Sequence, residues 1–339
     1  MKTLLYPEYE RLEIAEQPEP RPGEGEAVLR VAACGICGSE LEAFRHRSPR
    51  RVPPLVMGHE FCGVVEEVGP GVRSLARGAR VVSHSLVHCG HCVRCLRGDT
   101  HLCASRQIFG MQRAGAFAEY VVAPESSLIA WPASLSAEAA CLAEPLANGV
   151  HVVGLTRHLN PALVVIVGAG PIGLLCQQAF RSLTSADTVV ADLIGERLDI
   201  ANRLGARRAI HSRHEDFVAE VLAETGGEGA DVVVDAVGSG ASKRQALAAT
   251  RPGGATVWIG THENAVTLDS YEVTLAERQV RGSYAASLDE LKVAVDLLAG
   301  GRVDATSWSK TFPLVEGVAA FRRMLAAQGD DIKAVLLPA

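Results

Sequence analysis

The pattern of apolar and polar positions changes near residue 150 of the chain. Before that point, short runs alternate apolar with polar residues, as over Glu26–Val31 and Gly63–Val68. Such alternation is typical of half-buried strands. Glycine, proline and short polar segments separate the runs, as turns do between the strands of a sheet. The pattern therefore predicts a compact, mostly antiparallel β domain in the first part of the chain.

Beyond that point, continuous Val and Ile runs alternate with segments of helical character. The runs cover Leu163–Val167, Thr188–Asp192, Asp231–Asp235 and Ala255–Ile259. Strands of this composition are buried on both faces, and their alternation with helices predicts an α/β fold with a doubly wound parallel sheet. From about residue 285 the pattern predicts a helix over 288–298 and a last strand over 333–337. We expect this tail to return to the first domain.

Length, composition and charge fit two globular domains and limit the classes of partner. At 339 residues the chain is about twice the usual size of one domain. Apolar residues make up 48% and charged residues 21%, which is ordinary for a chain with a sizeable core. The net charge of −6 gives no overall attraction to nucleic acid or to an anionic membrane. We therefore expect neither of them as a partner.

One uncharged stretch, Leu159–Phe180, is long enough to span a membrane. Its prolines, glycines and glutamines suit a buried strand, a glycine turn and a helix better than a lipid-facing helix. The N-terminal residues lack the apolar core of a secretory signal. We expect a soluble, cytoplasmic protein, in which clustered cysteines indicate metal binding before disulfides.

A glycine-rich turn follows the first of the buried strands and opens a helical segment. It reads Gly168-Ala169-Gly170-Pro171-Ile172-Gly173, and Asp192 ends the next strand. This context is what a dinucleotide-binding fingerprint requires, because the glycines let the backbone approach a pyrophosphate and the acid binds a ribose. Asp192 favours NAD over NADP, whereas Arg197 can line the adenine side or contact a phosphate. The alternative is a glycine turn that serves only helix packing.

Four cysteines form a dense cluster, Cys89, Cys92, Cys95 and Cys103. Four thiolates with these short gaps suit a tetrahedral zinc ion with no open position, which is a structural site. An iron–sulfur cluster is the main alternative, although the bacterial ferredoxin pattern continues differently after its third cysteine.

A second, dispersed set of possible ligands consists of Cys37, His59, Glu60 and Glu144. A thiolate, an imidazole and one or two carboxylates leave a position for water or substrate, as in catalytic zinc sites. By chemistry alone this signal is modest, because a single buried cysteine is usually a small apolar residue. Glu60 could equally be an ordinary surface acid.

The segment Gly58-His59-Glu60-x2-Gly63-x5-Gly69-x2-Val72 resembles the zinc signature of the medium-chain, zinc-dependent alcohol and polyol dehydrogenases. The cysteine quartet resembles the structural-zinc lobe of that family, and Glu144-Pro145-Leu146 resembles its sorbitol and threonine dehydrogenase branch. Similarity extends through 115–121, the glycine fingerprint, 251–254 and the tail, so it covers essentially the whole chain.

The resemblance implies a mostly β, GroES-like catalytic domain over 1–147 and 285–339, with a structural-zinc lobe at about 86–106. It implies an NAD-binding Rossmann domain over 148–284. By resemblance, Cys37 and His59 bind the catalytic zinc, and Glu60 and Glu144 each bind the metal or hold its water. Ser39 matches the hydroxyl that takes the proton of the alcohol. The implied nicotinamide contacts are Ile259, Gly260 and Ser283.

Two positions depart from the family pattern. Glu40 occurs where the family commonly has an aspartate that orients the ligand histidine. Glu42 occurs where related enzymes often have a histidine that completes the proton relay, so either proton release takes another path or Glu42 has a different task. Together with the charged segment 44–47, these glutamates suggest a polar cleft.

The hypothesis is therefore a zinc-dependent oxidoreductase that passes a hydride from a secondary alcohol of a sugar, polyol, cyclitol or amino sugar to NAD. Threonine or another small alcohol is an alternative substrate. A non-enzymatic NAD- and zinc-binding sensor or scaffold, and an enzyme that uses NAD only transiently, are alternatives of other classes. The family resemblance implies a homo-oligomer, either a dimer or a tetramer.

Overall fold

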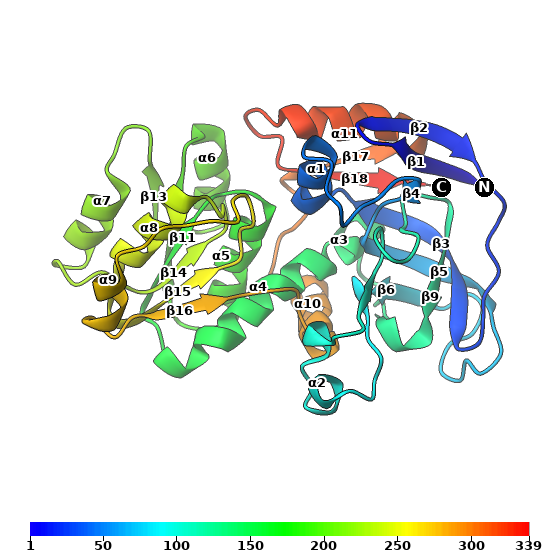
Figure 1. Ribbon diagram of the computed structural model, residues 1–339, viewed down its shortest axis with the longest axis horizontal. Helices are drawn as coiled ribbons and strands as arrows, with labels where there is room; N and C mark the ends of the chain where they lie inside the picture. Colours follow the sequence, from blue (N-terminus) through cyan, green and yellow to red (C-terminus); the bar gives the residue numbers. More distant parts are fainter. Residues whose placement is uncertain (339) are drawn as a thin grey trace. The chain divides into compact units, whose positions relative to one another are not determined.

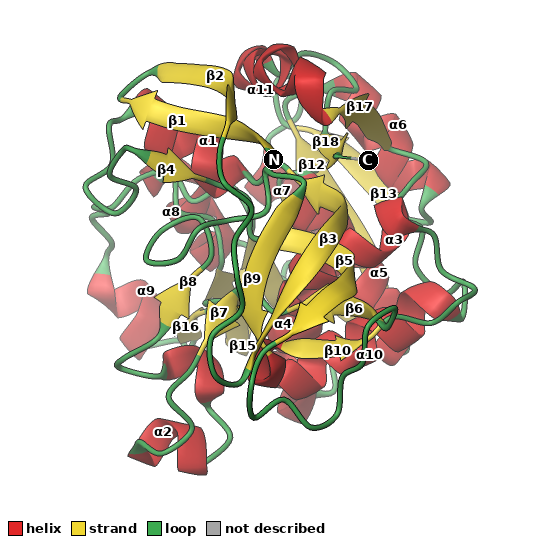
Figure 2. Cartoon of the chain, turned by 90° about the vertical axis from the view of Figure 1, so that its right-hand side faces the viewer, coloured by secondary structure: helices red, strands yellow, loops and turns green. Residues whose placement is uncertain are grey.

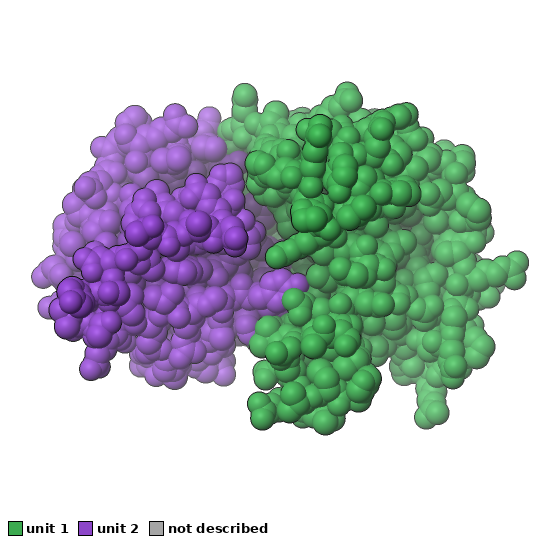
Figure 3. Space-filling model, in the orientation of Figure 1, with its two compact units in different colours: residues 1–144, 287–301, 305–339 green, residues 145–286, 302–304 purple. Residues whose placement is uncertain are grey.

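The computed structural model describes residues 1–338, and the chain divides into two compact units (Figure 3). Unit 1 comprises residues 1–144, 287–301 and the C-terminal segment from 305, and unit 2 comprises 145–286 and 302–304. The expected domain boundaries, after residues 147 and 284, lie within a few residues of these. Segment 302–304 joins unit 2 because Gln178 donates to the carbonyl of Asp304 (2.9 Å) and Ser182 to that of Arg302 (3.1 Å).

Unit 1 is built mostly on antiparallel strands, as the alternating pattern predicts, and β17 and β18 are its parallel pair. A seven-stranded sheet has the order β10-β6-β5-β3-β18-β17, with β9 also paired to β3, and a smaller sheet has the order β2-β1-β4. The strands of the large sheet are β3 (Glu26–Gly35), β5 (Glu60–Val68), β6 (Arg80–Ser83), β9 (Tyr120–Pro124), β10 (Leu128–Ala130), β17 (Ser309–Pro313) and β18 (Lys333–Leu337). Figure 2 shows β9, β3 and β5 side by side. The last strand returns as expected, because β18 pairs antiparallel to β3.

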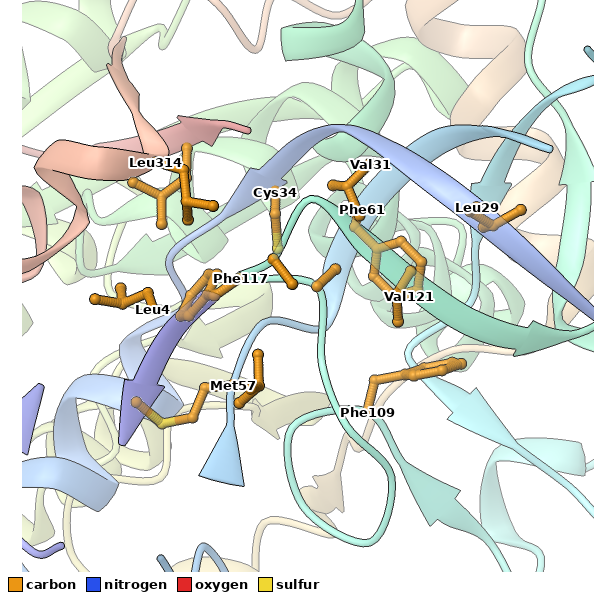
Figure 4. Close-up of a cluster of buried hydrophobic side chains, with 14 of the residues drawn as sticks. Leu4, Leu29, Val31, Cys34, Met57, Phe61, Phe109, Phe117, Val121 and Leu314 are labelled. Atoms are coloured by element: carbon orange, nitrogen blue, oxygen red, sulfur yellow. The ribbon is translucent and has the colours of Figure 1, made fainter. Parts of the chain in front are cut away.

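The remaining elements of unit 1 are short. They are β1 (Lys2–Glu8), β2 (Arg11–Glu16), β4 (Leu55–Val56), β7 (Leu86–Val87), β8 (Gln107–Ile108), α1 (Gly38–Arg45), α2 (Val93–Leu96), α3 (Ala137–Cys141), α10 (Leu288–Ala299), α11 (Gly317–Ala326) and the 3-10 turns η1 (Thr100–Leu102), η2 (Glu125–Ser127) and η4 (Leu314–Glu316). Large apolar side chains such as Leu29, Phe61 and Phe117 are fully buried between these elements (Figure 4). The edge of the Phe109 ring packs on Phe61 with ring centroids 5.1 Å apart.

Unit 2 is a six-stranded parallel sheet with the order β13-β12-β11-β14-β15-β16. This is the strand order of a doubly wound dinucleotide-binding fold, so the predicted fold class is confirmed. The strands are β11 (Leu163–Val167), β12 (Asp187–Asp192), β13 (Arg208–His211), β14 (Ala230–Asp235), β15 (Thr250–Trp258) and β16 (Gln279–Gly282). The helices are α4 (Ala143–Thr156, which begins in unit 1), α5 (Pro171–Leu183), α6 (Gly195–Arg203), α7 (Phe217–Glu224), α8 (Gly240–Ala248) and α9 (Ser270–Thr274), with the 3-10 turn η3 (Arg157–Leu159).

Helices of unit 2 pack directly on this sheet. Helices α5 and α6 contact the strands at one end of the sheet, and α8 contacts β14 and β15 (Figure 1). The uncharged stretch Leu159–Phe180 folds mainly as β11, the glycine turn and most of α5. Among residues 1–338, no helix combines the length and the apolar composition that a membrane span requires.

Candidate functional site

Strand pairing in unit 1 brings three ligand-type side chains together. Strands β3 and β5 pair antiparallel with Gly35 opposite Glu60, so the end of β3 lies beside the start of β5. Cys37 follows β3 as the N-cap of α1, and His59 immediately precedes β5. One ligand atom from each of Cys37, His59 and Glu60 lies within 4.8 Å of the others. Sulfur, imidazole nitrogen and carboxylate oxygen are the donors of catalytic zinc sites.

Glu40 organises the backbone and the imidazole of this group. It is the third residue of α1 and its carboxylate accepts the N–H of Cys37 at 3.0 Å, which closes a capping box. The other carboxylate oxygen accepts the N–H of Gly58 at 2.8 Å and lies 3.0 Å from Nδ1 of His59. With Nδ1 held in this way, Nε2 of His59 is the nitrogen left for a metal. The side chain of Glu40, longer than that of the aspartate common in the family, therefore reaches His59.

Burial and charge oppose each other in this Glu40–His59 pair of the metal-free protein. Burial alone raises the pKa of Glu40, but His59, Arg51 and the backbone N–H of Cys37 outweigh it and lower that pKa. Burial alone lowers the pKa of His59, yet Glu40 and Cys37 raise it well above its usual range. Each member of the pair therefore favours the charged form of the other.

Glu60 has a partner that the sequence analysis missed. The side chain of Lys333 donates to Glu60 Oε2 and, at 2.9 Å, to the carbonyl of Ile36. Both charged side chains are only 1% exposed. Burial by itself lowers the pKa of Lys333, but the Glu60 carboxylate outweighs it and raises that pKa. The one available signal was a lysine at the head of an otherwise apolar strand.

Glu144 lies near the same group but outside it. It belongs to the first turn of α4 and is buried. Burial raises the pKa of Glu144, opposed by His59, while Glu60 raises it further. Among the described residues, the ligand atoms that lie within 4.8 Å of one another come from Cys37, His59 and Glu60. Glu144 does not belong to this group. Glu144 is therefore a buried neighbour of the group and not a member of it.

Ser39, the predicted proton acceptor, and Glu42, whose task the sequence left open, both lie on α1. Ser39 Oγ donates to Cys37 Sγ at 3.3 Å. Glu42 lies three residues further along the helix, and its carboxylate contacts Nε2 of His46 at 3.2 Å. Phe44 packs against the rings of Tyr6 and Phe321 instead of lining a cleft. The Arg47 guanidinium likewise pairs with the carboxylate of Glu10. Within segment 44–47, Phe44 and Arg47 therefore contribute to the fold of unit 1.

The four clustered cysteines surround one point, in the lobe between β7 and β8. Neighbouring sulfurs are 3.5 or 3.9 Å apart. A tetrahedral zinc ion with Zn–S bonds of about 2.3 Å requires sulfurs about 3.8 Å apart, so this set fits one central ion. The backbone N–H of Cys95 lowers the pKa of Cys92 to about 6, whereas desolvation raises the pKa of Cys95 to about 12.

The glycine turn of unit 2 joins β11 to the start of α5. A Cβ on Gly173 would lie 1.8 Å from the carbonyl oxygen of Gly168, so only glycine allows the helix to start this close to the strand. At Gly170, in contrast, a Cβ would meet nothing within 4 Å, which leaves open space at the N-terminus of α5. Asp192 accepts the N–H groups of Ala169 (2.6 Å) and Ile194 (2.9 Å), which fixes its carboxylate beside the turn.

The other expected cofactor residues lie at the same carboxyl end of the parallel strands. The N–H groups of Ile259 and Gly260 bond to the carbonyl of Asp235 (3.1 and 2.9 Å). The hydroxyl of Ser283 and Nε of Arg197 are buried and have no hydrogen-bond partner within the described part of the chain. Buried polar atoms without partners cost free energy, and a bound nucleotide can supply the missing partners.

Comparison with known proteins assigns both units. Residues 23–133 match the family described as alcohol dehydrogenase GroES-like domain, and residues 171–300 match the zinc-binding dehydrogenase family. L-threonine 3-dehydrogenase of Pyrococcus horikoshii is 36% identical over 76% of this chain and 74% of its own. D-arabitol-phosphate dehydrogenase of Enterococcus avium is 32% identical over 97% of this chain and 95% of its own.

Solved structures agree over the full length. Alcohol dehydrogenase TADH from Thermus sp. ATN1 has a TM-score of 0.92 at 31% identity and covers 99% of both chains. Galactitol-1-phosphate dehydrogenase from Escherichia coli has a TM-score of 0.92 at 26% identity and covers 100% of both chains.

The fold and the two ligand sets define a nicotinamide-dependent oxidoreductase that acts on CH–OH groups with the help of zinc. This chain belongs to the zinc-dependent medium-chain alcohol and polyol dehydrogenase family.

Proposed function

We propose that this protein oxidises a secondary alcohol of a small polar substrate and passes the hydride to NAD. The observation that supports this most strongly is the group Cys37–His59–Glu60 with the Ser39 hydroxyl beside it. Relatives named for arabitol phosphate, galactitol 1-phosphate and L-idonate make a polyol or sugar derivative the preferred class of substrate. L-Threonine is the alternative, since several relatives are named L-threonine 3-dehydrogenase.

We assign the roles of the site residues from their contacts. Cys37, His59 and Glu60 hold the catalytic zinc, and Lys333 fixes one oxygen of Glu60. Zinc bound there would supply Lewis-acid chemistry, which lowers the pKa of a bound hydroxyl. Glu40 orients His59, and Glu144, buried nearby, holds water or the metal.

Proton removal in this proposal uses α1. Ser39 takes the proton of the substrate hydroxyl, because a serine hydroxyl both accepts and donates. Once the Ser39 O–H turns from Cys37 Sγ, it gives up its own proton, for which we propose Glu42 and the adjoining His46 as the route to solvent. Residues three apart on a helix share a face, so Glu42 lies on the same face of α1 as Ser39.

We propose NAD, rather than NADP, as the acceptor. The Asp192 carboxylate is fixed at the end of β12 by two backbone N–H groups, and a second anion such as a 2′-phosphate is repelled there. Each of its oxygens keeps a lone pair for a ribose hydroxyl. Related structures hold NADH in one case and NADP in another, so the choice depends on local residues.

The proposal is tested by following NADH formation in large excess over enzyme with a panel of substrates. The panel contains polyols, sugar phosphates, aminocyclitols, aminoglycosides, L-threonine and a long-chain aliphatic alcohol. Sustained turnover of a polar substrate, lost in Cys37→Ala but retained in Cys176→Ala, which lies outside both metal-ligand groups, supports the proposal. Preference for the aliphatic alcohol overturns the polar class. A stoichiometric burst indicates transient use of NAD, and a lack of any turnover indicates a sensor or scaffold.

We also propose a homo-oligomer in the cytoplasm. Nine described cysteines are free; four of them form one metal-ligand group and a fifth, Cys37, belongs to a second, which suits a reducing compartment. The family resemblance supports a dimer or tetramer. Light scattering and cell fractionation test these two statements.

A further inference from the structure

A buried arginine lies beside the predicted relay hydroxyl. Arg51 belongs to the loop between α1 and β4, and only 3% of its surface is exposed. Its guanidinium donates to the carbonyl of Ser39 at 2.8 Å and to the Ser39 hydroxyl at 3.2 Å. Its Nε is buried and has no hydrogen-bond partner among residues 1–338.

This cation has no carboxylate in contact to justify its burial. Within residues 1–338, no acidic side chain forms a salt bridge with Arg51. The positive charge of Arg51 helps to lower the pKa of Glu40. The two carboxylate oxygens of Glu40, however, contact Cys37, Gly58 and His59. Burial of an arginine without a paired acid lowers stability, so a role other than stabilising the fold is the better explanation.

The hydrogen bonds at Ser39 indicate that role. A serine hydroxyl has one proton to donate and two lone pairs that accept. The proton of Ser39 points to Cys37 Sγ and one lone pair receives Arg51. One lone pair is left, and its direction is fixed because the other two contacts are fixed.

We propose that Arg51 is a positioning residue for the dehydrogenase reaction. It holds the Ser39 hydroxyl so that its remaining lone pair accepts the hydroxyl of the substrate. The second contact, to the backbone carbonyl of the same residue, sets the guanidinium plane and prevents the serine side chain from rotating away. This inference rests on the proposed function, because it assigns Arg51 a task in that reaction.

A double-mutant cycle separates this role from a structural one. Arg51→Met, Ser39→Ala and the combined variant are compared with the unchanged protein, and Arg50→Met, an exposed neighbour, is the matched control. Loss of one hydrogen bond to a charged group corresponds to about tenfold or more in rate. We expect Arg51→Met to lower kcat by that factor with KM nearly unchanged. In the Ser39→Ala background the same change should alter kcat by less than about twofold, because coupled residues are not additive.

Zinc content, NADH affinity and the thermal unfolding midpoint are measured on every variant. For the control Arg50→Met, all three should equal those of the unchanged protein. A crystal structure of Arg51→Met should show Ser39 Oγ turned away from Cys37 Sγ. If Arg51→Met does not fold, Arg51→Lys, which keeps the charge but cannot make both contacts, goes through the same cycle.

Equal losses of kcat in both backgrounds, or no loss in either, would overturn the role of Arg51 while leaving the proposed function intact. If the unchanged protein shows no turnover of any alcohol while it binds zinc and NADH, the proposed function is wrong and the role of Arg51 falls with it.

Discussion

Replacement of Glu40 by glutamine tests how the metal group is assembled. The glutamine has the same shape, but it carries no charge and its amide nitrogen cannot accept a hydrogen bond. Glu40 receives three donors, the N–H groups of Cys37 and Gly58 and Nδ1 of His59. Whichever way the amide is turned, at least one backbone N–H in this fully buried position faces another donor.

The expected loss of zinc affinity in Glu40→Gln follows from the fact that Glu40 contacts the ligands and not the metal. Glu40 orients the ligands Cys37 and His59, and loss of such a partner lowers metal affinity by about 10- to 100-fold. Since each factor of ten is about 1.4 kcal/mol, binding weakens by roughly 1.4 to 2.8 kcal/mol. Competition with a chromophoric chelator measures this, with the cysteine-cluster zinc left in place as an internal reference.

Glu66→Gln is the matched control, since it removes an exposed carboxylate paired with Arg77, and exposed pairs contribute little. An affinity for the catalytic zinc that is unchanged in Glu40→Gln would refute the reasoning. Equal loss of zinc from both sites would do so too, because it would indicate general destabilisation.

Three further predictions concern charge, metal and cofactor. In protein stripped of zinc, Lys333→Met leaves Glu60 as a buried anion without its partner, so urea denaturation should show a free energy of unfolding lower by about 3–5 kcal/mol; adding Glu60→Gln should recover part of this loss, and a further loss would contradict the prediction. Cys92→Ala should lose one zinc and have a lower thermal unfolding midpoint, because a closed site contributes folding energy. Cys37→Ala should also lose one zinc, but its chain should stay folded. Equal unfolding midpoints of the two variants would contradict this distinction. Asp192→Ala should reduce the preference of kcat/KM for NAD over NADP, and an unchanged ratio would show that another residue makes the choice.

Local sequence was sufficient where the relevant residues are close together or strictly patterned. The four sulfurs of the cysteine lobe come from one short segment, and the strand–turn–helix of Gly168–Gly173 is fixed by steric limits on two of its glycines. Lys333 was missed because it is 273 residues from Glu60 in the sequence, and their contact exists only because β18 pairs with β3. Arg51 lies in a loop without periodicity, so no pattern indicated that its side chain is buried.

Charge balance in unit 1 links these buried groups to the metal. The charged side chains buried around the site are Glu40, Glu60, Glu144, Arg51 and Lys333. With Cys37 as a thiolate ligand, four negative charges face two positive ones. The excess of two negative charges is the charge that one zinc ion neutralises.

When the zinc is removed, bound protons can offset this excess of negative charge. This agrees with the direction of two shifts, since burial raises the pKa of Glu144 and the neighbouring Glu40 and Cys37 raise that of His59. A zinc ligand histidine must be neutral. Zinc binding to the emptied site at pH 7 should therefore release at least one proton per ion, measured by calorimetry in buffers of different ionisation enthalpy. Heats that do not depend on the buffer would show that His59 is already neutral and that the charges are balanced in another way.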